Sequence, residues 1–290
     1  MNATFTKKAI ETRITLKAGS FGGRGNQKIL RGLGTDVTIT KAGLPDKNTC
    51  TVKLYNLAYA DMEQLTTLGP GQGEKHKNLI TICAGSDDKT DLPVAFAGEI
   101  DSIAADYTGA PDICTVIKAS TGSYPALIAN KPMCIRGTAP VADVIGSLAA
   151  QCGYTFKNEG VTAQLRNSVL NGSPLQQAHQ AAEEAGAQLI VDDYQMILLP
   201  ANGCREGLAV LLTPETGLLG YPTFDNQGIK VKAIYNPNFQ FNGMIEVSSI
   251  VPRATGTWKI NKITHSLTAY RPTGGFWHSE LEATEAYPNE

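Results

Sequence analysis

The chain has 290 residues, of which 42% are hydrophobic and 18% charged, and its formal net charge is −2. This composition excludes a disordered chain, and the near-balanced charge gives no basic footprint for nucleic acid. No stretch approaches the roughly 20 apolar residues of a membrane span, and Lys7-Lys8 precedes no apolar core of a secretory signal. We therefore expect assembly in the cytoplasm and no stable membrane association.

The first part of the chain, residues 11–119, alternates apolar and polar residues as β-strands with one covered face do. Glycine and polar turns divide the short strands, which is typical of a barrel or sandwich. Strands are predicted at 14–18, 36–41, 49–56, 79–84, 94–103 and 113–119. This part is therefore expected to form a β domain.

Residues 57–77 are interpreted as an insertion in this β pattern. A short helix places Met62, Leu65 and Leu68 on one side, and a glycine-rich loop, 69–73, follows it. A second glycine-rich loop, 19–25, divides earlier strands. Neither loop has the G-K-[ST] ending of a phosphate-binding loop, and mobile loops on a β frame are common sites of partner contact. The candidate partner-contact residues are Phe21, Gly22, Gly23, Arg24, Gly71, Gln72 and Gly73.

The middle part, residues 120–205, changes to helical spacing. One helix is predicted from the apolar residues between Val141 and Cys152. A second begins after Ser173, where Gln176 completes a capping box and Pro174 takes the first position. Each helix leads into a strand, and the second of these strands turns at Asp192-Asp193 into a third. The middle part is thus expected to be a small α+β module.

The last part of the chain, residues 206–290, repeats the strand pattern of the first. The run 52–56 matches the run 231–236, and both copies end in a hairpin whose first strand carries Ile-x-x-Ile, at 100–103 and 260–263. The alternative is a chance likeness between two ordinary β segments. If the repeat is real, the insertion has no counterpart in the second copy.

The Ile-x-x-Ile pairs also predict a local irregularity. A spacing of three breaks strict alternation, so each strand needs a β-bulge if both isoleucines face inward. Ile103 precedes Val116 by 13 residues and Ile263 precedes Trp277 by 14. Val116 is therefore predicted to lie at the place of Trp277. Superposition should also put Ile100 on Ile260.

The residues that could carry chemistry form no recognisable catalytic or metal site. The acidic pairs Asp87-Asp88, Glu183-Glu184 and Asp192-Asp193 are predicted to be solvated, because neighbours in sequence rarely face one cleft. The histidines show no ligand spacing, and the six cysteines include no C-x-x-C pair. We expect no enzymatic activity, no cofactor and no metal.

The chain as a whole resembles the baseplate hub proteins at the end of contractile bacteriophage tails, especially those of Mu-like phages. The resemblance is carried by the run 52–57 with its short helix, by the helix-Gly-strand run 138–156, and by Gly172-Ser173-Pro174. It is strongest in Thr216 to Thr223, Gly228 to Pro237 and the closing stretch from Thr257 to His278. The motifs are a pattern of the whole chain and not a chemical signature.

This resemblance implies a mainly β fold with an α+β insert. Two related, tail-tube-like β-barrel domains, 1–119 and 206–290, would flank the module 120–205. It implies a homotrimeric hub in the virion that joins the sixfold tail tube to the threefold spike, because two barrels in each of three chains give a six-barrel ring. The implied partners are further copies of the chain, the tail tube protein, a separate spike protein and possible contact with the tape measure protein. DNA would only pass through the lumen.

Two other classes of function compete with the hub. One is a tail-tip enzyme that degrades the cell wall, which release of fragments from peptidoglycan would reveal. The other is a receptor- or carbohydrate-binding β module, for which a surface cluster of aromatic residues is expected. The sequence has only two tryptophans, and Trp277 is predicted to pack in a half-buried strand. The hub is therefore the favoured function.

Overall fold

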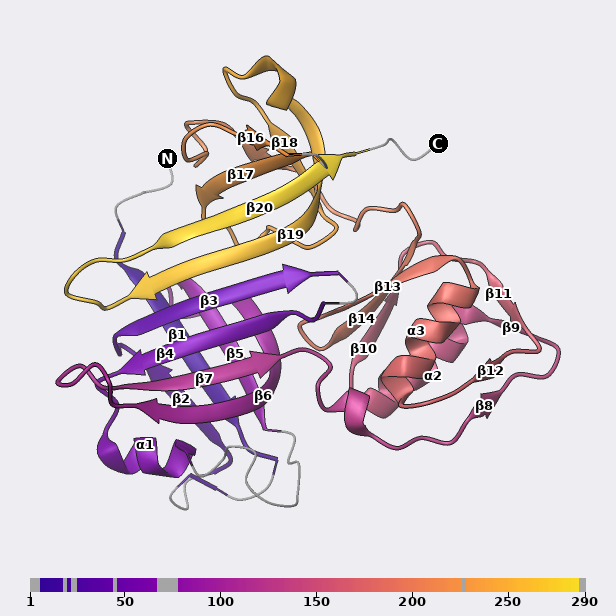
Figure 1. Ribbon diagram of the computed structural model, residues 1–290, viewed down its shortest axis with the longest axis horizontal. Coiled ribbons are helices and arrows are strands. Elements are labelled where there is room, and N and C mark those ends of the chain that lie inside the picture. Colours follow the sequence, from indigo (N-terminus) through magenta and orange to yellow (C-terminus); the bar gives the residue numbers. More distant parts are fainter. Residues whose placement is uncertain are drawn as a thin grey trace.

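The structure is a computed structural model that describes residues 6–17, 20–21, 25–43, 46–66, 78–225 and 228–286. Most of its strands belong to one large sheet (Figure 1). The first part of the chain contributes β1 (Lys8–Thr15), β2 (Gln27–Arg31), β3 (Thr35–Ala42), β4 (Thr49–Tyr55), β5 (Leu79–Ser86), β6 (Val94–Asp106) and β7 (Cys114–Ser120). Their order in the sheet is β3-β4-β7-β6-β5-β1-β2. The predicted mainly β class is confirmed.

The strands of the first part curl around one hydrophobic core. In Figure 1, β3, β4, β7 and β6 lie in front of β1, β2 and β5. Apolar side chains from alternate positions of these strands fill the space between, among them Ile39, Val52 and Ile117. Helix α1 (Tyr59–Thr66) adds Met62 and Leu65 to this core, as predicted from their spacing. Leu68 and the glycine-rich loop that follows lie outside the described residues.

The last part of the chain forms the other end of the same sheet. Its strands are β15 (Val210–Leu212), β16 (Thr223–Phe224), β17 (Ile229–Ile234), β18 (Met244–Val247), β19 (Gly256–Ala269) and β20 (Trp277–Glu285), with a short 3-10 helix at Pro252–Ala254. Here the order is β16-β17-β20-β19-β18-β15. A second core lies behind these strands and includes Ile245, Trp258 and Leu281.

The strand pairing confirms the internal repeat. Six strands of each part correspond in chain order and in sheet order, β3-β4-β7-β6-β5-β1 with β16-β17-β20-β19-β18-β15. The register agrees as well, since Val52 lies opposite Ile117 and Val231 lies opposite Leu281. One difference is that β1 runs antiparallel to β5 whereas β15 runs parallel to β18. Among the described residues of the second copy, strand β2 and helix α1 have no counterpart.

Both predicted β-bulges are present, and they occupy corresponding positions. The β6–β7 register shifts between Ile100 and Ser102. The β19–β20 register shifts between Ile260 and Lys262. The extra residue returns the second isoleucine of each pair to the core side, because side chains otherwise alternate between faces. A matching irregularity in two hairpins is difficult to explain without a common origin.

One predicted correspondence is wrong. Ile117 pairs with Ile103, and Leu281 pairs with Ile263, so Val116 corresponds to Glu280 and not to Trp277. The place of Trp277 in the first copy belongs to Ile113, just before β7. The error arose because the paired residues Ile103 and Ile117 are 14 positions apart whereas Ile263 and Leu281 are 18 apart, a difference of four and not of one.

The two copies are joined edge to edge by pairing between β19 and β3. Residues 262–269 of β19 pair antiparallel with residues 35–42 of β3. Leu267 and Ala269 of β19 accordingly contribute to the core of the first part. The chain therefore carries one uninterrupted row of strands, β16-β17-β20-β19-β3-β4-β7-β6, which we call the long sheet.

The middle part packs beside the long sheet as a separate α+β unit (Figure 1). Helices α2 (Val141–Cys152) and α3 (Pro174–Glu184) cover a small sheet of β10 (Thr155–Asn158), β13 (Ala187–Asp192) and β14 (Gln195–Pro200). Two short ladders pair β9 (Thr138–Pro140) with β11 (Gln164–Arg166) and β8 (Met133–Cys134) with β12 (Val169–Leu170), after a 3-10 turn at Pro125–Leu127.

The helix ends of the middle part are those that the sequence predicts. The Ser173 side chain accepts a hydrogen bond from the Gln176 backbone, and the Gln176 side chain accepts one from the Ser173 backbone. Gly153 ends α2 with φ of 73°, a left-handed conformation that glycine adopts without the steric cost of a Cβ. Val141 to Cys152 bury the predicted apolar face. The capping chemistry thus fixes both helices locally.

Candidate functional site

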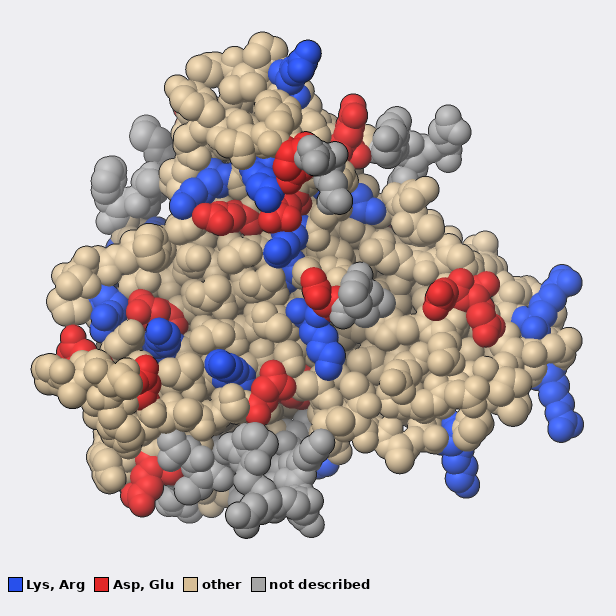
Figure 2. Space-filling view, in the orientation of Figure 1, with Lys and Arg blue, Asp and Glu red and all other residues tan. Residues whose placement is uncertain are grey.

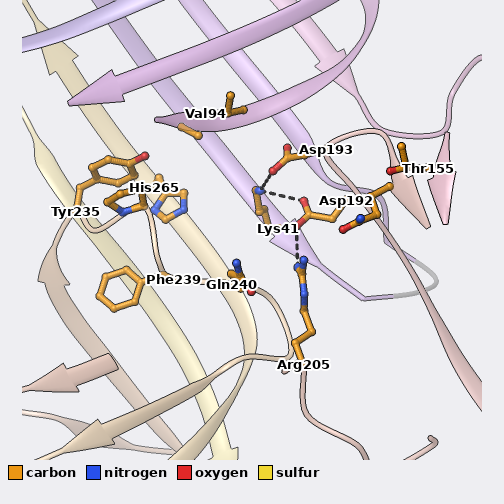
Figure 3. A pocket seen from close by; sticks show the side chains of 13 residues that line it. Lys41, Val94, Thr155, Asp192, Asp193, Arg205, Tyr235, Phe239, Gln240 and His265 are labelled. Atoms are coloured by element: carbon orange, nitrogen blue, oxygen red, sulfur yellow. Dashed lines mark hydrogen bonds and ion pairs between the residues drawn. The ribbon is translucent and has the colours of Figure 1, made fainter. Parts of the chain in front are cut away.

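The first and middle parts of the chain meet at a buried cluster of charges, beside side chains of the last part (Figure 3). Lys41 of β3 places its Nζ 2.9 Å from Asp192 Oδ1 and 2.7 Å from Asp193 Oδ2, at the turn between β13 and β14. Arg205, which leads into the last part of the chain, places Nη1 3.0 Å from Asp192 Oδ2. Asn48 donates a further hydrogen bond to Asp192 Oδ1. We call these residues the junction cluster.

Burial and mutual attraction determine the protonation of the junction cluster. Burial alone would lower the pKa of Lys41, but Asp192 and Asp193 outweigh it and raise that pKa. Burial alone would raise the pKa of Asp192, but Lys41 and Arg205 outweigh it and lower that pKa. Both groups are therefore charged at neutral pH. Only about 5% of each residue is exposed, so each charge depends on its partners for solvation.

The predicted solvation of Asp192 and Asp193 is wrong, although the predicted turn is correct. Asp193 and Tyr194 have φ of 46° and 63°, as in a tight hairpin turn. The turn inserts its carboxylates against β3. One feature of the sequence could have predicted this burial. Lys41 continues the inward-facing positions of Val37 and Ile39, and a charge at a core position needs a buried partner of opposite charge.

Two tyrosine hydroxyls tie the middle part to the first part next to the junction cluster. The Tyr154 hydroxyl donates to Glu99 Oε1 at 2.6 Å and accepts from the Gly122 backbone N–H at 3.0 Å. The Tyr194 hydroxyl donates to the Gly98 carbonyl at 2.5 Å. Glu99 and Gly98 belong to β6. These contacts hold the module against the sheet from a second direction.

A polar cavity of about 290 Å³ opens beside the junction cluster. Lys41, Asp193, Arg205, Tyr235 and His265 all line it, and Figure 3 shows these side chains converging from β3, the β13–β14 turn and the last part of the chain. Its lining offers both charges and hydrogen-bonding groups. Lys41 and Arg205 face the two carboxylates in this lining, and burial raises the pKa of Asp193.

His265 beside this cavity makes stability depend on pH. Its ring is buried, hydrogen-bonds Ser279 and stacks edge-on against Tyr235, and burial lowers its pKa to about 3, with Lys41 acting in the same direction.

Because an unfolded histidine titrates near pH 6.5, the stability due to neutral His265 is complete above that pH and is lost as pH falls toward 3. A His265→Asn variant should lack this loss, about 1.4 kcal/mol per pH unit below pH 6. Urea unfolding at pH 7.0, 5.5 and 4.5 measures it. Parallel curves for both proteins would contradict the assignment.

The other candidate residues form no catalytic arrangement in the described parts of the chain. Glu183 and Glu184 are exposed on α3, as predicted. Asp88 is exposed, whereas Asp87 is half-buried and accepts a hydrogen bond from Tyr270, the main reason why the pKa of Asp87 is lowered. Within those parts, no group of three or more His, Cys, Asp or Glu residues could hold a metal ion.

The described helices and cysteines add two structural facts. No described helix is long and apolar enough to cross a membrane. All six cysteines are free; Cys50, Cys83 and Cys114 are buried in β4, β5 and β7, whereas Cys134 in β8 is exposed.

Of the predicted partner-contact residues, the structure describes only Phe21. Its side chain is buried in the first core, and its backbone N–H donates to the Gly25 carbonyl. Gly22, Gly23, Arg24, Gly71, Gln72 and Gly73 lie outside the described residues. As sites of partner contact, these loops stay a prediction.

The outer face of the long sheet is broad, polar and balanced in charge. On β17 and β20, Lys230 lies 3.6 Å from Glu282 and Lys232 lies 3.3 Å from Glu280. Figure 2 shows this face, where blue and red groups lie beside one another within a mostly uncharged surface. Such a face has neither a basic stripe nor an acidic one. It is suited to contact without strong electrostatic retention.

Comparison with known proteins identifies the family. The family model described as baseplate hub gp41 matches residues 12–276. The fold is similar to a 43 kDa tail protein of prophage MuSo2 from Shewanella oneidensis, with a TM-score of 0.63, 10% identity and coverage of 95% of this chain and 97% of that one.

Two further solved structures have the same fold. A tail protein from Neisseria meningitidis MC58 matches with a TM-score of 0.64, 10% identity and coverage of 97% and 100%. The Escherichia coli c3393 protein, described as a type VI secretion component similar to T4 tail proteins gp27 and gp5, matches with a TM-score of 0.56, 8% identity and coverage of 88% and 74%.

A search of curated protein sequences finds no match. The family match spans most of the chain and agrees with the resemblance carried by its strand pattern. The chain belongs to the baseplate hub gp41 family and is a structural protein of the bacteriophage tail baseplate.

Proposed function

We propose that the protein is a homotrimeric hub that joins the sixfold tail tube to a threefold spike and surrounds a channel for DNA. The observation that carries this proposal is the internal repeat, with its shared strand order and its two matching bulges. Two barrel-like copies in each of three chains give six similar units around a ring. Such a ring offers sixfold symmetry to one partner and threefold symmetry to the other.

The continuous long sheet supports a channel wall. Because β19 pairs with β3, the two copies present one curved surface and leave no gap between them. The surface is mostly uncharged and the lysines of β17 are paired with glutamates of β20, so it would bind phosphate groups only weakly. Each additional unpaired basic contact would strengthen salt-dependent binding to DNA. A balanced wall therefore suits a channel through which DNA must pass.

The middle part is proposed to be a separate domain, with boundaries near residues 119 and 205. It has its own core, and it is fixed to the long sheet by the junction cluster and by Tyr154 and Tyr194. It interrupts neither copy of the repeat. We propose that the tail tube protein contacts one rim of the ring, the spike protein the other, and the tape measure protein the lumen, in virions assembled in the host cytoplasm.

The copy number tests the proposal. Light scattering on the hub bound to its spike protein should give three copies of this chain. A stable dimer or a hexamer of the chain would contradict the symmetry adaptor, because neither presents two repeats in each of three chains.

A further inference from the structure

The long sheet ends at one side in a half-open strand. Strand β6 pairs with β7 through Asp106, but on its other side its pairing with β5 stops at Glu99, where the Ile100 N–H still donates to the Asn78 carbonyl. Among the described residues, no strand pairs with this side of Ser102 to Asp106. Within the part of the chain that the structure describes, the C-terminal half of β6 therefore presents backbone donors and acceptors that no strand pairs.

At its other end, the long sheet finishes with β16, which has one partner. Thr223 and Phe224 pair with Lys230 and Ile229 of β17, and no other described strand pairs with β16. Tyr221 is 68% exposed and Phe224 51% exposed. Long-lived exposure of an apolar edge is unfavourable, since such an edge is a template for another strand.

The chain contains an internal template for joining these two edges. Strand β19 pairs with β18 through its N-terminal half and with β3 through its C-terminal half. In the repeat, β6 corresponds to β19 and β16 corresponds to β3. The contact that joins the two copies within one chain therefore has a counterpart for which both strands are present, each with one side to which no described strand pairs.

We propose that β16 of one chain pairs antiparallel with the C-terminal half of β6 in the next chain. The proposal rests on the trimeric hub proposed above and specifies which surfaces meet. The strand pairings within each copy of the repeat show which residue of the first copy corresponds to which residue of the second. Since His265 lies opposite Ile39, Ala105 should lie opposite Phe224 of the neighbour. Asp106 should likewise lie opposite Thr223.

The hydrogen-bonding direction of β16 fits this pairing. The Asp225 N–H donates inward to the Gly228 carbonyl. Because alternate residues of a strand direct their N–H and C=O groups to opposite sides, those of Phe224 point outward to the free edge. The equivalent residue Ile39 faces β19 within the chain.

Helix α1, as far as the structure describes it, contributes to the core on one face of β6. Its buried residues Met62 and Leu65 belong to the same core as Ile103, so α1 packs on the core face of the sheet near β6 (Figure 1). Ala104, on the opposite face of β6, is exposed. A strand entering in the plane of the sheet would then cover α1 and extend the core.

Within a single chain, the free sides of β6 and β16 are too far apart to form hydrogen bonds with each other. They terminate the row β16-β17-β20-β19-β3-β4-β7-β6. At about 4.8 Å per strand spacing they lie roughly 30 Å apart along the sheet. Any short covalent link between them must therefore join different chains.

Cross-linking tests the pairing. In a Cys134→Ser background, which removes the exposed native thiol, Ala104→Cys and Thr223→Cys place exposed thiols at diagonal positions about 7–8 Å apart. A short bis-maleimide should convert most of the protein to covalent dimers and closed trimers. Each single variant, and Ala104→Cys combined with Ile250→Cys, should remain monomeric on a denaturing gel.

The outcomes separate this pairing from the proposed trimer. Light scattering of the same samples before cross-linking gives the copy number. Three copies together with covalent dimers and trimers on the gel, which we call the covalent ladder, support both the trimer and the β6–β16 contact. Three copies without the ladder, or a ladder equally strong with Ile250→Cys, overturn the β6–β16 contact and leave the trimer. Failure of the unmodified hub to form a trimer, with no ladder, overturns both.

Discussion

Replacing Lys41 by methionine is expected to lower the free energy of unfolding by about 3–5 kcal/mol. The lysine lies 2.9 and 2.7 Å from Asp192 and Asp193, and only about 5% of Lys41 and of Asp192 is exposed. Methionine fills similar space but leaves Asp192 with Arg205 and Asn48, and Asp193 with the Ala97 backbone N–H. The cost arises from uncompensated buried charge and not from a lost surface ion pair. Equilibrium unfolding in urea at pH 7 measures it.

A matched variant distinguishes this cost from a general effect of removing a lysine. Lys53 lies on the exposed face of β4, and Lys53→Met should change stability by no more than about 0.5 kcal/mol. A second variant, Lys41→Met with Asp192→Asn, should recover part of the loss because it removes one buried charge. Equal stability of Lys41→Met and Lys53→Met would show that the junction cluster does not hold the first and middle parts together.

Changing Phe224 to aspartate is expected to abolish the trimer at micromolar concentration while the chain stays folded. The side chain is half exposed in the single chain, so the substitution should have little effect on its unfolding. At a β6–β16 contact, a carboxylate would be desolvated without a partner. A cost of about 2 kcal/mol at each contact raises the dissociation constant about 30-fold. Light scattering and circular dichroism measure assembly and folding.

Phe276 provides the control for this variant. It has the same side chain and is 65% exposed, but it lies in the hairpin between β19 and β20, away from both free edges. Phe276→Asp should remain trimeric. If both variants stay trimeric, or both dissociate, the β16 edge has no special role in assembly.

The repeat could be predicted from the sequence because its evidence is local. Ile100 and Ile103, like Ile260 and Ile263, break strict alternation, and a broken period has one simple structural solution, the bulge. The helix ends were predictable for the same reason. Ser173 and Gln176 satisfy one another's backbone groups within four residues, so no distant part of the chain affects the outcome.

Contacts between distant segments were not predictable from pattern alone. The sequences of β3 and β19 do not predict that these strands pair, since an edge strand and a central strand can have the same alternating pattern. The burial of Asp192 depends on Lys41, 151 positions earlier. A turn sequence predicts its backbone but not the surface against which it packs. The spacing between paired strand residues was also not predictable, and Val116 therefore corresponds to Glu280 and not, as predicted, to Trp277.

An image reconstruction of the tail end tests the central claim most directly, because it shows copy number and strand pairing together. The account predicts three copies of this chain around one channel, with β16 of each chain beside β6 of the next and the outer face of the long sheet lining the lumen. A ring with another number of copies, or three copies whose long sheets face away from the channel, would contradict it.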